Sequence, residues 1–203
     1  MPSIYDLKPS FQNLLRPLVR ELARAGVSAN QITVLALALS CIVGGLVAAF
    51  PRQQWPLLLV PVVMFTRMAL NAIDGMLARE CNMKTALGGF LNELGDVISD
   101  AALYLPFALI PGIAPAPVVI LVVLAAVSEM TGVVAQSLGA SRRYDGPMGK
   151  SDRAFVFGAL GLALGLGFEA GRWVDMLMLM LVVLTAVTIF NRMRNALIEL
   201  GAK

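Results

Sequence analysis

Six long apolar stretches are the feature that most restricts how this chain can fold. They cover roughly residues 30–50, 55–79, 86–110, 116–140, 153–169 and 173–193. Each is near the ~20 residues that an α-helix needs to cross the hydrocarbon core of a bilayer. Because 58% of the 203 residues are hydrophobic and only 14% are charged, the sequence predicts an all-α, polytopic membrane protein with six transmembrane helices. No linker or low-complexity segment interrupts the chain, so residues 1–203 are expected to form a single domain.

Residues 1–28 precede the first apolar stretch and contain no continuous apolar run, so we expect no cleaved signal peptide. They carry an apolar stripe at helical spacing, with basic residues on the opposite side. The stripe consists of Leu7, Phe11, Leu14, Leu15, Leu18 and Leu22, and the basic residues are Arg16, Arg20 and Arg24. This pattern predicts an amphipathic helix that lies in the headgroup region, with a solvent-facing helix as the alternative. Ser28 or Asn30 can cap the helix that follows.

Basic residues gather on one side of the predicted spans. That side holds Lys8, Arg16, Arg20, Arg24, Lys84, Arg142, Arg143, Lys150, Arg192 and Arg194, and the other side holds Arg52 and Arg172. Lys and Arg are enriched on the cytoplasmic side of membrane proteins. We therefore expect a multi-pass protein of a bacterial-type inner membrane with both termini in the cytoplasm. The net charge is only +3, and we expect no nucleic-acid partner.

Carboxylate and amide side chains interrupt the second and third apolar stretches. They are Asn71 and Asp74 on the second stretch, and Asn92, Glu93, Asp96 and Asp100 on the third. On each helix these residues share or border one face, so the two helices can direct oxygen ligands into one cleft. Carboxylates at membrane depth are costly and usually mark a functional site. Such ligands suit magnesium, with manganese as the alternative, whereas the absence of histidine argues against zinc.

The spacing of these residues resembles the signature of the CDP-alcohol phosphatidyltransferase family, which is D-x-x-D-G-x-x-A-R, eight residues, then G-x-x-x-D-x-x-x-D. The matching positions are Asp74, Gly75, Ala78, Arg79, Gly88 and Asp96, while Asn71 and Asn92 stand where the family has its first and third aspartates. The resemblance implies a magnesium-dependent enzyme that moves a phosphatidyl group from CDP-diacylglycerol to an alcohol and releases CMP. It also implies a homodimer surrounded by membrane lipids.

The resemblance gives each motif residue a role. Asn71, Asp74, Asn92 and Asp96 would bind the metal, and Asp96 would also be the base that deprotonates the acceptor hydroxyl. Gly75, Ala78, Arg79 and Gly88 would form the nucleotide cradle. The residues themselves agree with these roles, because glycine allows close approach to a ligand and arginine offers a fork of donors to phosphate. The alternative is that the glycines only let the helices pack closely.

The connection between the fourth and fifth stretches, residues 141–153, is rich in glycine and basic residues. Lys150 and Arg153 lie where this loop enters a helix, an arrangement that can hold an anion. By resemblance, the segment contacts a phosphate of the acceptor or of the lipid. A phosphorylated acceptor such as glycerol 3-phosphate is therefore favoured. Basic residues at a cytoplasmic boundary are also expected from topology alone.

Two other classes of function stay open on the sequence alone. Asn71 and Asn92 suit a catalytically silent homologue that acts as a lipid-binding membrane subunit, unless Glu93 and Asp100 restore the lost charge. Buried charges also occur in ion-coupled transporters, but here the carboxylates cluster near one face of the membrane.

Three further polar residues lie inside the apolar stretches. Arg67 is expected either to pair with a motif carboxylate or to face a substrate phosphate. For Glu129 and Gln136 we expect structural roles, such as hydrogen bonds between helices.

Overall fold

The structure is a computed structural model that describes the backbone of residues 4–201 and the side chains of residues 11–201. The two ends of the predicted domain 1–203, and the side chains of Leu7 and Lys8, lie outside this part. The described chain is all-helical, with seven α-helices and one short 3₁₀ helix. They are α1 (Ile4–Arg24), α2 (Ala29–Ala49), α3 (Trp55–Glu80), α4 (Ala86–Tyr104), η1 (Leu105–Leu109), α5 (Pro115–Ser137), α6 (Lys150–Gly165) and α7 (Arg172–Glu199).

Four of these helices, α2, α3, α5 and α7, are long and apolar enough to cross a membrane. α4 carries Glu93, Asp96 and Asp100, and α6 is only 16 residues long. α4 therefore fails the requirement on composition, and α6 fails the requirement on length. The protein is thus an all-helical membrane protein, and four of the six predicted spans are supported by length and composition.

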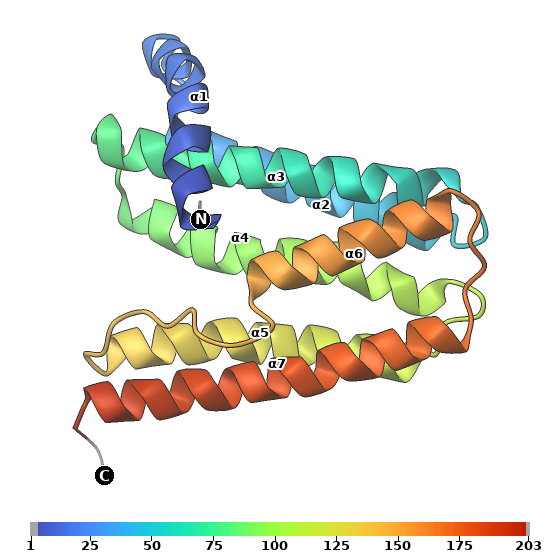
Figure 1. Ribbon diagram of the computed structural model, residues 1–203. Helices are drawn as coiled ribbons and strands as arrows, with labels where there is room; N and C mark the ends of the chain where they lie inside the picture. The colour runs from blue at the N-terminus through green and yellow to red at the C-terminus, as the bar shows by residue number, and fades with distance from the viewer. Residues whose placement is uncertain (1–3, 202–203) are drawn as a thin grey trace.

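The long helices run roughly alongside one another, and α1 crosses them at one end (Figure 1). α2 contacts both α3 and α4, α5 pairs with α7, and α6 lies on α3. The loop 138–149, the connection between α3 and α4, and the end of α7 all lie at the end where α1 crosses, which we call the α1 end. The loop turns back into the bundle, so that α6 begins well inside this end (Figure 1).

Local capping explains where two of these helices begin. Ser28 Oγ accepts a hydrogen bond from the Gln31 amide, and the Gln31 side chain accepts one from the Ser28 amide in return. Thr85 caps α4 in a similar way, since its hydroxyl accepts from the Gly88 amide at 2.9 Å. Of the two caps predicted for α2, Ser28 is the one that is used.

The apolar residues of α1 are divided between two environments. Leu15 and Leu22 of the predicted stripe pack with Val19 against α3, and Val19 is 1% exposed, whereas Leu14 and Leu18 are 75% and 48% exposed. An ion pair of 3.1 Å between Arg16 and Glu80 fixes the position of α1 on the end of α3. One side of the predicted stripe therefore holds the helix to the bundle, and the other side is left on the surface.

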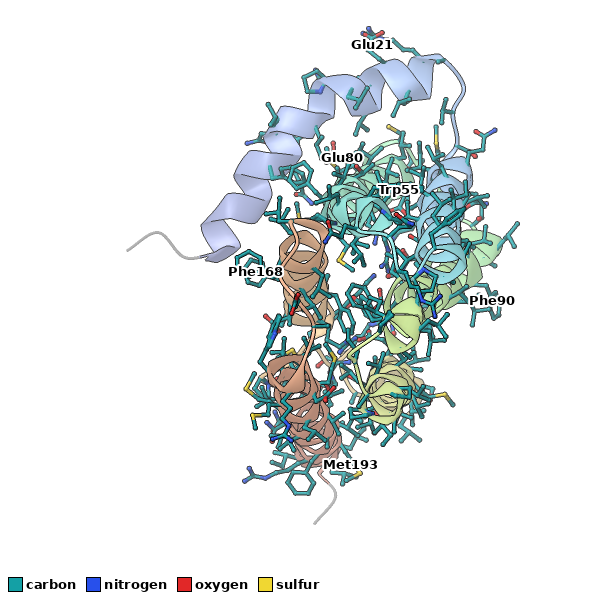
Figure 2. All side chains as sticks on the ribbon, turned by 90° about the vertical axis from the view of Figure 1, so that its right-hand side faces the viewer. Glu21, Trp55, Glu80, Phe90, Phe168 and Met193 are labelled. Atoms are coloured by element: carbon teal, nitrogen blue, oxygen red, sulfur yellow. The ribbon has the colours of Figure 1, made fainter. Side chains whose placement is uncertain are left out.

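Large apolar side chains cover the outside of the bundle. Phe90 on α4 and Met193 on α7 point away from the neighbouring helices (Figure 2), and they are 67% and 48% exposed. An apolar exterior of this extent suits contact with lipid and not with water. Asp100 of α4 and Arg153 of α6 are instead buried inside the bundle, where they belong to the site described next.

Candidate functional site

A cavity of about 310 Å³ opens near the α1 end, between α2, α3 and the start of α4. Its polar and small lining residues are Asn30, Thr33, Asp74, Gly75, Ala78, Arg79, Lys84, Thr85, Gly88, Gly89 and Asn92. All four residues that were predicted to cradle the nucleotide are among them, together with two of the predicted metal ligands. The motif residues of α3 and those of α4 therefore line one cavity.

The two motif glycines leave space that a side chain would fill. An added Cβ at Gly75 would lie 3.0 Å from Nη2 of Arg79, whose guanidinium folds back over the glycine. At Gly88 a Cβ would lie 2.6 Å from Oδ1 of Asn30. Arg79 is exposed and makes no ion pair with any described residue, so its donors can bind a phosphate.

Asp74 lies in the cavity wall and is 6% exposed. The hydroxyl of Thr33 on α2 donates a hydrogen bond to Oδ2 of Asp74 at 2.8 Å. This contact leaves Oδ1 for a further partner. No role was predicted for Thr33, because nothing in a single sequence shows which side chain of α2 faces α3.

Asp96 is surrounded by three donors from two helices, α3 and α6. Asn71 Nδ2 donates to Oδ1 at 3.1 Å, and Arg67 Nη2 lies 3.2 Å from the same oxygen. Lys150 contacts Oδ2 from the start of α6. The structure thus brings together Asn71, Asp96 and Lys150, which the sequence analysis had placed in a metal site and an acceptor site. Arg67 takes the first of its two predicted roles and pairs with a motif carboxylate.

Glu93 and Asp100 have other partners. Asp100 is 4% exposed, accepts from Arg67 Nη1 at 2.6 Å and lies 3.8 Å from Arg153 Nη2. Glu93 pairs with Arg142. Because arginines already balance both carboxylates, this geometry does not favour the idea that they replace the charge missing at the two asparagines.

Arg153 also belongs to a cluster of three arginines around Glu129 of α5. Arg153 Nη2 and Arg192 Nη1 lie 3.2 and 3.4 Å from Oε1, and Arg142 Nη2 lies 4.0 Å from Oε2. Arg153 and Arg192 are 0% and 1% exposed. We call Glu129 with these three arginines the arginine cluster.

The sequence did not show that two members of the arginine cluster meet, although the predicted hydrogen bonds between helices are found at Glu129. Arg192 was assigned to a cytoplasmic boundary, and Glu129 was given a structural role together with Gln136. In the structure Gln136 is exposed, whereas Glu129 lies among the guanidinium groups. The sequence did contain a signal for Glu129: a carboxylate in the middle of an apolar stretch is costly unless it has a partner of opposite charge, so a buried arginine could have been expected near it.

The loop 138–149 is fixed against α7 by its backbone. The Met148 amide donates to Thr188 Oγ1 at 2.9 Å, and Arg192 Nε donates to the Asp145 carbonyl at 3.3 Å. At Gly146 φ is +124°, and an added Cβ would lie 2.6 Å from Thr188, so glycine is needed here. Burial lowers the pKa of Arg142, but its hydrogen bond and charge interaction with Glu93 outweigh this effect and raise the pKa.

The start of α6 was predicted to hold an anion partly through its backbone amides. Asp152 already accepts from the Gly149 amide at 2.8 Å, which satisfies one of these amides and places a negative charge beside the helix start. An anion here would therefore depend mainly on the side chains of Lys150 and Arg153.

An aromatic layer separates these charges from the apolar core. Tyr104 and Phe157 stack with ring centroids 4.1 Å apart, and Phe107 meets Phe157 edge-on at 5.1 Å. All three are fully buried. Tyr104 follows Asp100 by one helical turn, and Phe157 follows Arg153 in the same way, so this layer closes the site toward the middle of the bundle.

The side chains at the site fit a hard divalent cation. Asp74 and Asp96 supply carboxylates, and Asn71 and Asn92 can add amide oxygens, all of which are ligands that magnesium and manganese accept. Within residues 4–201 no group of three or more His, Cys, Asp or Glu is arranged to hold a metal. The amides can therefore add to a ligand set, and Asp96, which Lys150 and Arg67 already pair, would exchange one of these partners to bind a cation.

Comparison with known proteins gives one consistent result. The sequence model of the CDP-alcohol phosphatidyltransferase family matches residues 26–193. The chain is 46% identical over 196 residues to the inner membrane protein YnbA of Escherichia coli (strain K12), and the alignment covers 97% of each chain.

Solved structures share the fold. Phosphatidylinositol phosphate synthase (PgsA1) of Mycobacterium tuberculosis with CDP-DAG bound superimposes with a TM-score of 0.74 and 22% identity, covering 92% of this chain and 94% of that one. The same enzyme in complex with manganese and citrate gives a TM-score of 0.75 at 22% identity, covering 92% and 90%. Because the family match extends over most of the sequence and a relative aligns along nearly all of it, this chain belongs to the CDP-alcohol phosphatidyltransferase family and is a transferase of that class.

Proposed function

We propose that this protein transfers the phosphatidyl group of CDP-diacylglycerol to a phosphorylated alcohol, such as glycerol 3-phosphate, and releases CMP. One observation carries this proposal: helix α4 lines the nucleotide cavity and also pairs with the buried arginine cluster. Asn92 lines the cavity, and its neighbour Glu93 pairs with Arg142 of the cluster. Two anionic substrates would therefore meet between α4 and the start of α6.

The nucleotide half of the site is formed by Gly75, Ala78, Arg79 and Gly88. The structural neighbour that was solved with CDP-DAG supports this assignment through the shared fold. Asn71, Asp74, Asn92 and Asp96 would hold magnesium, with manganese as the alternative. When bound, the cation would polarise the attacked phosphoryl group and offset charge on the departing CMP.

The acceptor half is formed by Lys150, Arg153 and their neighbours. In the connected set of charges the cations outnumber the carboxylates by one: Arg67, Arg142, Lys150, Arg153 and Arg192 face Glu93, Asp96, Asp100 and Glu129. Nε of Arg142 and Nε of Arg153 are buried and have no hydrogen-bond partner among the described residues. Buried donors are nearly always satisfied, so a phosphate of the acceptor would complete this site.

Asp96 lies where the two halves meet. It shares Lys150 with the acceptor half and Asn71 with the metal ligands. In this position its Oδ2 would take the proton from the acceptor hydroxyl, while Lys150 and Arg153 bind the acceptor phosphate and orient that hydroxyl.

We also propose that α4 and α6 cross the bilayer with the other four helices. Their charged residues Asp100 and Arg153 face inward and are buried, while Phe90 and Phe155 are 67% and 77% exposed. η1 lengthens α4 toward the required span. α1 would lie in the headgroup region of the cytoplasmic side with Leu14 and Leu18 toward lipid. Residues 1–203 would act as one domain and, by family resemblance, as a homodimer.

The test is release of CMP by purified protein in detergent. Labelled CDP-diacylglycerol is supplied with magnesium or manganese and with glycerol 3-phosphate, glycerol or serine, and each reaction is repeated with EDTA. We expect cation-dependent CMP release with glycerol 3-phosphate and little with the other two alcohols. A preference for serine or glycerol would contradict the assignment of a phosphorylated acceptor.

The same assay distinguishes the silent homologue. If no acceptor gives CMP with wild-type protein but the double variant Asn71→Asp/Asn92→Asp releases it, the chain has lost activity through its two asparagines. Inactivity of both proteins with all acceptors would contradict the proposed transfer.

A further inference from the structure

Glu129 is the one carboxylate, among the described residues, that lies within 4.0 Å of Arg142, Arg153 and Arg192 together. These arginines come from the loop 138–149, α6 and α7, and Glu129 comes from α5. Its side chain is only 12% exposed. One side chain thus joins the segments that form the acceptor half of the site.

A simple structural ion pair does not explain this arrangement. Glu93 and Asp100 also pair with Arg142 and Arg153. Across the connected charges the cations still outnumber the carboxylates by one, and the buried Nε atoms of these two arginines have no partner in the described part of the chain. A pair that served only stability would be balanced in charge and complete in hydrogen bonds. The excess of positive charge and the unused donors indicate that an anion completes the cluster.

Each arginine of the cluster is also held by a second contact. Arg153 Nη1 donates to the Met148 carbonyl at 3.0 Å, Arg192 Nε donates to the Asp145 carbonyl at 3.3 Å, and Arg142 Nη1 pairs with Glu93. Two fixed points on one planar group determine its orientation. The guanidinium groups are therefore set in place before an anion arrives, which lowers the cost of binding it.

We propose that Glu129 is a positioning residue that sets the preference of this enzyme for a phosphorylated acceptor, by holding Arg142, Arg153 and Arg192 as one preassembled phosphate receptor. The proposal rests on the proposed function for the reaction in which the receptor is used. The positioning role and a pure charge effect predict opposite changes in phosphate affinity when Glu129 is replaced. Removing a negative charge next to three cations should strengthen phosphate binding if only charge mattered, whereas losing the common anchor should weaken it.

The experiment compares wild type with Glu129→Gln, Glu129→Asp and the control Gln136→Ala, which changes an exposed polar residue two turns away on the same helix. Binding of inorganic phosphate is measured by titration calorimetry on each purified protein in detergent. Steady-state kinetics with glycerol 3-phosphate and CDP-diacylglycerol then give both KM values and kcat.

We expect Glu129→Gln to weaken binding of inorganic phosphate and to raise the KM for glycerol 3-phosphate by at least about 10-fold, with kcat and the KM for CDP-diacylglycerol changed much less. Glu129→Asp keeps the charge but shortens the side chain, so we expect a smaller loss of phosphate binding in the same direction. Gln136→Ala should match wild type. If Glu129→Gln does not yield folded protein, Glu129→Asp provides the same comparison.

Several outcomes would overturn the inference. If Glu129→Gln binds phosphate as tightly as wild type or more tightly, only the charge of Glu129 matters and the positioning role is wrong. Wild-type phosphate binding by Glu129→Asp would lead to the same conclusion. Failure of wild type to bind inorganic phosphate would also overturn it. The proposed function fails separately, when wild type releases no CMP with any acceptor even though phosphate binds and depends on Glu129.

Discussion

At the scale of single residues, opposite charges at this site alternate in one connected series. The order is Glu93, Arg142, Glu129, Arg153, Asp100, Arg67, Asp96 and Lys150, with Arg192 joined to Glu129. Buried charges of this kind are tolerated because each one has a partner of the opposite sign. Asp74 lies outside this series and lines the nucleotide cavity, and Asp96 joins the series to the motif residue Asn71. Glu93 and Asp100, by contrast, are paired with arginines alone among the described residues.

This separation predicts different results for two carboxylates of α4. Asp96→Asn should lower the rate of CMP release by roughly 10²–10⁴-fold, because it removes the proposed base. Glu93→Gln should keep the dependence of activity on magnesium concentration close to that of wild type. Magnesium titrations of CMP release from both variants check this. A loss of magnesium dependence in Glu93→Gln would instead support compensation for the two asparagines.

Asp100 should matter mainly for stability. Asp100→Asn leaves Arg67 with Asp96 alone and takes a carboxylate away from fully buried Arg153. Breaking a buried pair from one side costs about 3–5 kcal/mol, so we expect a clearly lower Tm for the purified protein in detergent. Asp175→Asn is a suitable comparison for acidic residues, since Asp175 accepts from the Ala114 amide at the opposite end of the bundle and is not part of the series. Equal melting of Asp100→Asn and wild type would contradict the structural role.

Lys150 connects the acceptor half to Asp96, and its removal should show this in the kinetics. We expect Lys150→Ala to raise the KM for glycerol 3-phosphate by roughly 10- to 100-fold, the range for one charge-assisted hydrogen bond. The KM for CDP-diacylglycerol should change little. Arg194→Ala removes an exposed basic residue of the same membrane boundary and should leave both values unchanged. Equal effects of the two substitutions would mean that Lys150 only helps to set the orientation of the protein in the membrane.

At the scale of helices, close approach depends on single glycines. A Cβ at Gly44 would overlap the backbone carbonyl of Ala102 where α2 meets α4, whereas nothing lies within 4 Å of a Cβ at Gly45. These adjacent positions form a matched pair within one helix. Since the helices that line the nucleotide cavity are α2, α3 and α4, the contact at Gly44 bears directly on the shape of the site.

We therefore expect Gly44→Ala to lower the Tm and to raise the KM for CDP-diacylglycerol, because the two helices must move apart. Gly45→Ala should be neutral or stabilise the protein by about 0.5–1 kcal/mol, the usual gain of alanine over glycine inside a helix. Thermal unfolding of the two purified variants gives the comparison. Similar behaviour of both would mean that α2 and α4 do not pack as closely as described.

The helices themselves could be predicted well from the sequence, because the signals are local. Apolar runs of sufficient length located all six long segments, and Ser28 gave the start of α2. The differences occur at the ends: α6 begins at Lys150 and not at residue 153, and α7 continues to Glu199, beyond residue 193. Both differences arise because a helix does not stop where its apolar run stops, once polar residues can cap it or extend it past the membrane.

At the scale of the whole molecule, the site depends on which helices are neighbours. The motif spacing predicted the residues of the nucleotide cavity, since these lie on two consecutive helices. Convergence of Arg67, Glu129 and Arg192 requires that α6 lies on α3 and that α5 pairs with α7, and no periodicity in the sequence contains that information. The burial of Arg192 could not be predicted for this reason, because a basic residue near the end of a span has the same local pattern at a boundary and in a buried site.

The last prediction concerns orientation in the membrane. The loop 138–149, the end of α7 and the crossing helix α1 lie together at the α1 end (Figure 1), and most basic residues of the connections belong to this end. Positive residues are retained in the cytoplasm, and the nucleotide substrate of the proposed reaction is found there. Reporter fusions after residue 203 and within residues 142–150 should therefore both report a cytoplasmic location, while a fusion at Arg52 should report the opposite side. Opposite locations for the first two fusions would contradict six spans, because two crossings separate them and an even number of crossings returns the chain to the same side. A periplasmic signal from both would contradict the predicted orientation.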